Sequence, residues 1–248
     1  MNTPHIQIAA EKVFNLFGLP VTNTLLTSWI VLLLLAAAAF LVFKKLKPVP
    51  AFLQNLWEIF VEGFLKMIEG VLGARKKAER YLPLVATIFI FVLVSNWLGI
   101  FPGVGSVGFY EEVHGQKVFV PFFRSAASDL NFTLALAVLT VVLVNIYGAR
   151  AIGLRHHLGK FFTFKNPIAF GVGLLEFISE FAKMISFSFR LFGNVFAGEV
   201  LLIIAAFLAP LFAPIPFLVL EIFVGFIQAL VFAMLSMVFI SIMVVEHQ

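Results

Sequence analysis

Three uncharged apolar segments constrain the fold of this chain more than any other feature. They cover residues 25–43, 81–101 and 130–147, and none of them contains Asp, Glu, Lys or Arg. Each is long enough to cross a hydrocarbon core of about 30 Å as a helix rising 1.5 Å per residue. Because irregular backbone cannot face lipid, the sequence predicts that all three are membrane helices.

The composition also indicates that a bilayer is the solvent. Of the 248 residues, 62% are hydrophobic and 12% are charged, against about 25% charged in soluble domains. The chain has no Cys, which excludes disulfides, thiol catalysis and Cys-based zinc sites. The first twenty residues carry Glu11 and Lys12 but no basic leader, so we expect the first span to remain as an anchor.

Residues 50–80 follow a different pattern. Their apolar residues recur at helical spacing, and their polar residues share the opposite side. This polar side carries Glu58, Glu62, Lys66 and Glu69. The pattern predicts an amphipathic helix at the membrane interface, ending in a basic run that begins at Arg75.

The last two apolar segments, residues 167–209 and 217–245, are longer. The first would make a helix of ~60 Å, so it is either one strongly tilted helix or a hairpin turning at Gly193-Asn194. A single tilted crossing is favoured, because 11 Lys and Arg residues then fall on one side. The positive-inside rule makes that side cytoplasmic, with the N-terminus outside and the C-terminus inside. The outer loop, residues 102–129, has strand-like patterns on both sides of His114-Gly115 and predicts a small hairpin.

Among the predicted membrane segments, only these last two contain charged residues. They are Glu176, Glu180, Lys183, Arg190 and Glu199 in the first, and Glu221 in the second. A charge at the membrane centre costs at least ~2.5–3.5 kcal/mol, so several charges on one helix imply a wet or paired interior.

For Arg190, a long side chain that reaches the membrane surface, or a structural ion pair with a distant helix, is the less favoured explanation. About 30 Å of helix separates Arg190 from Pro167 and from Pro210. An arginine stays charged, so it cannot shuttle protons itself. It can hold a passing carboxylate in the ionised form, and it can repel cations that would cross directly.

Helix geometry separates the acidic residues into two groups. Glu176 is on nearly the same face as Arg190, ~21 Å towards the cytoplasm, whereas Glu199 is ~13 Å towards the outside and on the opposite side of the helix. This spacing predicts two wet clefts, one from each side, that meet near Arg190. Glu221 and Gln228 share a face of the last helix and would complete the outer cleft. The alternatives are simple solvation of Glu176 and Glu180 at a helix start, and a structural network between Glu199 and Glu221.

The segment "FRLFGNVFAGEVLL" closely resembles the signature of subunit a, the stator channel of F-type ATP synthases. Further similarity lies in "VTNTLLTSW", "SNWLGIFP", "SAASDLNFTLALA" and "IQALVFAML". The resemblance implies an all-α integral membrane protein with about five membrane helices and one interfacial amphipathic helix. The last two helices would be long and strongly tilted, and would wrap around a rotor ring.

The resemblance also implies roles for individual residues. Arg190 would face the carboxylates of the rotor ring, the c-ring. The outer half-channel would contain Asn194, Glu199, Glu221 and Gln228, with Glu221 standing where some family members carry His. The cytoplasmic exit would contain Glu176 and Glu180, and Asp129, Ser186 and Lys183 are weaker candidates. Expected partners are the c-ring, the b-type subunits of the peripheral stalk and the lipid of a bacterial plasma membrane, with no cofactor, metal or nucleic acid.

Other functions fit the sequence less well. A free-standing transporter that binds an anionic substrate at Arg190 would be expected to show internal repeats, and none is visible. A purely structural membrane subunit would tolerate Arg190→Gln with assembly defects alone. An enzyme would need a metal-ligand spacing, a nucleophile–base pair or a phosphate loop, and none occurs. His156 and His157 lie in a basic loop, where we expect them to be solvated.

Overall fold

The computed structural model describes residues 7–44, 52–101, 103–113, 116–161, 166–210 and 212–245. Within these ranges, five helices are long and apolar enough to cross a membrane, which confirms an all-α, multi-pass membrane protein. They are α1 (Asn23–Lys44), α3 (Arg75–Ile100), α4 (Leu130–Ile152), α6 (Pro167–Leu208) and α7 (Pro214–Val245).

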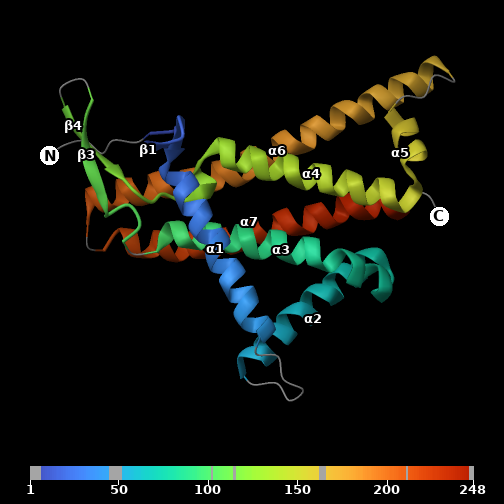
Figure 1. Ribbon diagram of the computed structural model, residues 1–248, viewed down its shortest axis with the longest axis horizontal. Helices are drawn as coiled ribbons and strands as arrows, with labels where there is room; N and C mark the ends of the chain where they lie inside the picture. Colours follow the sequence, from blue (N-terminus) through green and yellow to red (C-terminus); the bar gives the residue numbers. More distant parts are fainter. Residues whose placement is uncertain are drawn as a thin grey trace.

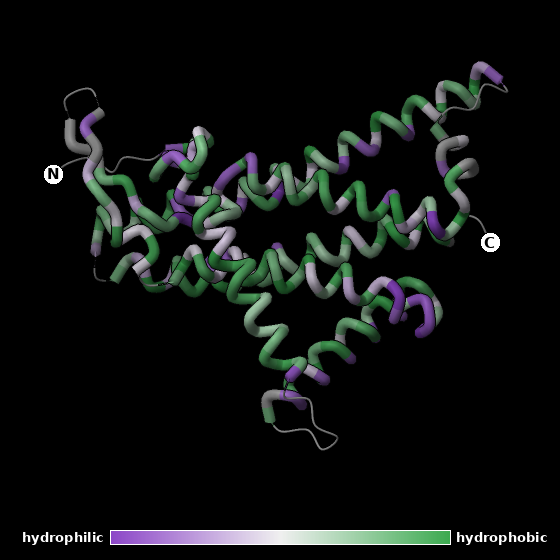
Figure 2. Tube along the Cα trace, in the orientation of Figure 1, coloured by the Kyte–Doolittle hydropathy of each residue, from purple (hydrophilic) through white to green (hydrophobic). Residues whose placement is uncertain are grey.

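Four of these helices pack side by side, and α1 crosses the bundle at a steep angle (Figure 1). The core lies between α3, α4, α6 and α7 and includes one face of the helix α2 (Phe52–Leu72). Within it, Phe187 of α6 stacks on Phe232 of α7 with ring centroids 4.6 Å apart. Apolar residues extend along the whole length of the helices, and polar residues gather mainly near helix ends and connections (Figure 2). This surface suits a chain whose solvent is lipid.

The helix α6 runs unbroken from Pro167 to Leu208, so the alternative of a hairpin at Gly193-Asn194 is wrong. Leu191 and Val195, on either side of that pair, are buried against the bundle, which keeps this turn helical. With 42 residues, α6 is ~63 Å long, about twice the hydrocarbon thickness. A helix of that length is accommodated in a bilayer by tilting.

The predicted amphipathic helix is shorter than expected. Helix α2 spans Phe52–Leu72 and does not reach residue 80. Gly73 ends it with φ 71° and a hydrogen bond from its N–H to the Glu69 carbonyl, the left-handed helix end that glycine favours. The basic run therefore begins α3, which starts six residues before the predicted span. Arg75 donates to both oxygens of Glu62 across this corner, at 3.0 and 2.9 Å, and these bonds lower the pKa of the Glu62 carboxyl.

Two small hairpins lie at one end of the molecule (Figure 1). The predicted hairpin in the outer loop is confirmed by the antiparallel pair β3 (Gly108–Val113) and β4 (Gln116–Pro121), although the turn residues His114 and Gly115 lie outside the described residues. A second pair, β1 (Lys12–Leu16) and β2 (Leu19–Thr22), precedes α1 and was not predicted. The short helices η1 (Ala126–Ser128) and α5 (Leu154–Phe161) flank α4.

Candidate functional site

Arg190 lies on the face of α6 that points away from the bundle. Phe187 and Leu191 on the inner face are buried, whereas Arg190 and Ser186 are exposed. A long hydrogen bond of 3.5 Å joins Arg190 Nη2 to Ser186 Oγ. Within the described ranges, Arg190 forms no ion pair with a carboxylate. The helix thus presents a permanent positive charge outward.

One stripe of the surface that contains Arg190 is made of small side chains. Ser186 precedes Arg190, and Gly193 and Ala197 follow it, along one exposed stripe of α6 with Asn194 beside it. A methyl group placed at Gly193 would have no atom within 4 Å, so nothing from the described chain covers this position. Another helix could therefore approach α6 closely at the level of the arginine.

Glu199 pairs with Arg124, not with Arg190. Arg124 Nε donates to Glu199 Oε1 at 2.9 Å and to Oε2 at 3.2 Å, which fits the predicted position of Glu199 on the side of the helix opposite Arg190. The Arg124 side chain is 8% exposed and that of Glu199 is 26% exposed. Arg124 also donates to the carbonyls of Gln7, at 2.9 Å, and Ala9, at 3.3 Å. The sequence did not predict Arg124 as a site residue. The feature that could have indicated it is an isolated arginine near the end of the outer loop.

Glu221 of α7 reaches across to α6 beside Glu199. An added methyl at Gly198 would lie 2.8 Å from Glu221 Oε1, so the carboxylate occupies the space that the glycine leaves. Glu221 Oε2 is buried and has no hydrogen-bond partner in the described chain. Arg124, Glu199 and Glu221 together form a cluster of one cation and two carboxylates, which we call the outer cluster.

Polar side chains of α3 face α7 next to this cluster. Asn96 Nδ2 donates to the Gly225 carbonyl at 3.0 Å, and Trp97 Nε1 donates to the Ile222 carbonyl at 3.1 Å. These bonds hold the turn of α7 that follows Glu221. Gln228 lies half-buried further along α7. The sequence reasoning did not assign Asn96 or Trp97 to the site, because their partners are backbone atoms of a distant helix.

Glu180, expected near a cytoplasmic exit, is a buried link between helices. Its Oε1 accepts from Lys183 Nζ at 2.6 Å, and its Oε2 accepts from Asn145 Nδ2 of α4 at 3.0 Å. Asn145 Oδ1 in turn contacts His157 Nε2 of α5 at 3.0 Å. The expectation that His157 is solvated is wrong, because α5 folds back on α4 and leaves this side chain 5% exposed. Glu176, one turn before Glu180, is half-buried.

Asp129 caps the start of α4. Its Oδ1 accepts from the Asn131 N–H at 2.9 Å, and its Oδ2 accepts from Thr24 Oγ1 of α1 at 2.8 Å. Both carboxylate oxygens therefore bind helix ends, as expected for an N-cap residue. This arrangement gives Asp129 a structural role at the start of α4.

The fold and these residues define a multi-pass membrane protein whose long helix α6 carries an outward-facing arginine between two groups of ionisable side chains. Comparison with known proteins gives the family. Residues 25–241 match the family described as ATP synthase A chain. The chain therefore belongs to the ATP synthase A chain family.

Individual relatives agree over nearly the whole chain. ATP synthase subunit a of Moorella thermoacetica is 35% identical over 236 residues, which cover 95% of this chain and 97% of that protein. Subunit a of Campylobacter concisus is 35% identical, covering 88% of this chain and 89% of that protein. For subunit a of Gloeobacter violaceus the identity is 34%, with coverage of 91% and 85%.

Proposed function

We propose that this chain is the proton-translocating stator of an F-type ATP synthase, with two offset half-channels that load and unload carboxylates on a c-ring. The observation that carries this proposal is the outward-facing charge of Arg190, which forms no ion pair within the described residues and lies on a stripe of small side chains. A cation in a membrane helix is costly unless it is hydrated or paired. A carboxylate on a passing ring subunit is the partner that this position fits.

The outer cluster supplies the access route from outside. A proton reaches Glu199 or Glu221 and moves to a ring carboxylate, which becomes neutral and can turn through lipid. Glu221 Oε2, buried without a partner in the described chain, suits a group that exchanges protons with water or with its neighbour. Asn194 and Gln228 extend this route as polar residues on α6 and α7.

Arg190 separates the two half-channels. It attracts the ring carboxylate that has just lost its proton and keeps that site charged, so the site cannot move back into lipid. It also repels protons and other cations that would cross without turning the ring. Each charge that crosses yields ~2.3 kcal/mol per 100 mV, so several transfers are needed for one ATP.

The released proton leaves on the cytoplasmic side near Glu176. Glu180 and Lys183 stabilise the cytoplasmic side of the bundle through the hydrogen bond between Glu180 and Asn145, and this link sets the distance between α4 and α6. In this orientation the N-terminus is outside a bacterial plasma membrane and the C-terminus is inside. The basic start of α3 and Lys44 at the end of α1 support it. The peripheral-stalk b-type subunits and lipid are the remaining partners.

The test uses Arg190→Ala in the assembled enzyme, with Arg150→Ala as the matched control, because Arg150 is also exposed but lies at the end of α4. ATP-driven proton pumping is measured in inverted membrane vesicles, together with the amount of assembled complex. We expect Arg190→Ala to assemble normally and to lose pumping, and Arg150→Ala to keep it. Normal pumping in Arg190→Ala, or loss of assembly alone, would refute the proposal and favour a structural subunit.

A further inference from the structure

The β1–β2 hairpin ends in a turn that an aqueous environment does not favour. Leu16 pairs with Leu19, so the turn consists of Phe17 and Gly18, with φ values of 49° and 84°. Two positive φ values are typical of a type I′ turn, for which Asn-Gly is the preferred pair. A bulky aromatic residue with positive φ is strained. The Phe17 ring is 99% exposed, so packing within the described chain does not offset this strain.

The apolar surface continues along one face of the hairpin. Side chains alternate along a strand, and Phe14 pairs with Val21 as Leu16 pairs with Leu19, so these four share a face. Phe14, Leu16 and Leu19 are 41%, 43% and 72% exposed, whereas Val21, close to α1, is 3% exposed and already packed. A two-stranded hairpin is marginally stable by itself, and an exposed apolar strand tends to aggregate. This face therefore needs a cover.

The base of the hairpin is fixed to α1. Strand β2 ends at Thr22 and α1 begins at Asn23, with no linker between them. The backbone N–H of Asn23 donates to the Glu11 carbonyl at 3.0 Å, and Asn23 Nδ2 donates to the Glu11 carboxylate at 3.3 Å. Asn23 is fully buried. The direction of the hairpin is thus set by the position of α1.

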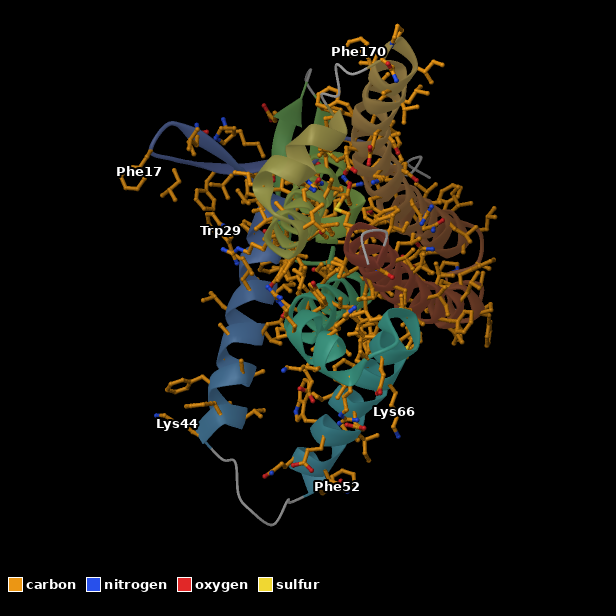
Figure 3. All side chains as sticks on the ribbon, turned by 90° about the vertical axis from the view of Figure 1, so that its right-hand side faces the viewer. Phe17, Trp29, Lys44, Phe52, Lys66 and Phe170 are labelled. Atoms are coloured by element: carbon orange, nitrogen blue, oxygen red, sulfur yellow. The ribbon has the colours of Figure 1, made fainter. Side chains whose placement is uncertain are left out.

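The length of α1 places the hairpin at the surface of the bilayer. With 22 residues, α1 is ~33 Å long, close to the hydrocarbon thickness of about 30 Å. When α1 crosses the membrane, Asn23 lies at the edge of the hydrocarbon. Figure 3 shows the hairpin leaving this end of α1 sideways, away from the bundle, with Phe17 at the far tip. Aromatic side chains are enriched in this interfacial layer.

We infer that the β1–β2 hairpin is a membrane-surface anchor, whose apolar face and Phe17 insert into the interfacial layer of the bilayer beside α1. Lipid fits this face better than a protein partner, because the face is continuous with the lipid-facing side of α1, where Leu25 and Trp29 are 38% and 39% exposed. The anchor would hold the outer end of α1 and the N-terminal segment that binds Arg124. This inference does not depend on the proposed function.

The test exploits the absence of Cys from the chain, which allows a single nitroxide label. Leu19→Cys carries the label on the apolar face and keeps Phe17 in place, and Phe17→Cys carries it at the tip. Leu33→Cys on α1, which is 71% exposed, is the lipid reference, and Lys12→Cys at the hairpin base is the reference for water. The labelled complex is reconstituted in vesicles of phosphatidylcholine and phosphatidylglycerol. Power-saturation EPR then measures accessibility to oxygen, which concentrates in lipid, and to a water-soluble nickel chelate.

We expect the labels at residues 17 and 19 to be more accessible to oxygen than to nickel, as at residue 33, and the label at residue 12 to show the reverse. Preference for nickel would place the hairpin in water. Low accessibility to both reagents would place it against another protein. Either result would overturn the inference. ATP-driven pumping by the labelled complex, measured in parallel, tests the proposed function separately.

A second substitution tests the role of Phe17. Phe17→Asn supplies the residue that a type I′ turn prefers, so the hairpin remains folded while its apolar tip is lost. We expect the label at residue 19 to shift from oxygen towards nickel accessibility in Phe17→Asn, and to keep its oxygen preference in Phe17→Trp. An unchanged label in Phe17→Asn would contradict the anchoring role of this side chain.

Discussion

Gly198→Ala tests whether the position of the Glu221 carboxylate controls proton transfer. The added methyl would lie 2.8 Å from Oε1, 3.0 Å from Cδ and 3.4 Å from Cγ of Glu221. An ordinary contact begins at 3.4 Å, so Oε1 must move by at least 3.4 − 2.8 = 0.6 Å. The Glu221 side chain is flexible, so we expect the carboxylate to move and the helix backbone to stay.

The expected effect on transfer is larger than the effect on folding. A displaced rotamer costs ~0.5–1.5 kcal/mol, a small part of the ~5–15 kcal/mol that stabilises a typical protein. A misplacement of ~1 Å can slow a reaction by about 10²-fold. The carboxylate of Glu221 shifts by a little over half of that distance in Gly198→Ala. We therefore expect proton pumping to fall about tenfold, while the amount of assembled complex stays near normal.

The assay compares Gly198→Ala with Gly171→Ala on the same helix, where an added methyl meets no atom within 4 Å. ATP-driven pumping is divided by the amount of assembled complex in each membrane preparation. Combining Gly198→Ala with Glu221→Asp shortens the carboxylate side chain by one methylene, removes the clash and should restore part of the rate lost in Gly198→Ala. Pumping at the parental rate in Gly198→Ala would refute the reasoning, as would equal losses in Gly198→Ala and Gly171→Ala.

Three further substitutions separate transport from stability. Arg124→Gln removes hydrogen bonds to the charged Glu199, worth ~1.5–3 kcal/mol, so proton pumping per assembled complex should fall about tenfold. Arg124→Lys should lose less of the pumping rate. Equal pumping rates in the parent protein and both variants would contradict the role of the ion pair. Glu180→Leu leaves the charge of Lys183, whose side chain is 22% exposed, without its partner. Breaking a fully buried pair costs ~3–5 kcal/mol and a partly buried one less, so immunoblots should show less subunit in the membrane. An unchanged amount would show that the link with Asn145 does not stabilise the fold. Asp129→Ala removes the N-cap of α4, at a cost of ~1–2 kcal/mol. The unfolding temperature of the purified complex should therefore fall, while proton pumping per complex stays unchanged. Loss of pumping with a normal unfolding temperature would instead place Asp129 on the proton path.

The membrane helices could be predicted because lipid imposes a simple rule on composition. A run such as residues 25–43 has no charge and no alternative to a helix in a bilayer. The end of α2 could not be found in the same way. The apolar pattern stops at Leu72, and the basic run that follows fits the end of one helix as well as the start of the next. Only the positive φ of Gly73, together with the ion pair between Arg75 and Glu62, shows that the chain turns there.

The candidate site was predictable only where one helix carries it. The separation of Arg190 from Glu199 follows from helical geometry, because nine residues correspond to half a turn beyond two full turns. The partner of Glu199 does not follow, since Arg124 lies 75 residues away on a loop whose path the sequence does not determine. His157 was misjudged for the same reason: its burial depends on Asn145 of another helix.

The central claim is that the Arg190 face of α6 lies against a carboxylate-bearing helix of another chain. Disulfide cross-linking tests this claim directly, because the chain has no Cys of its own. Asn194→Cys lies on the exposed face beside Arg190, and Ser188→Cys on the buried face is the control. Each is paired with a cysteine next to the ring carboxylate. The account predicts cross-links to the ring from residue 194 and none from residue 188, and the absence of a cross-link from residue 194 in an assembled, pumping enzyme would contradict it.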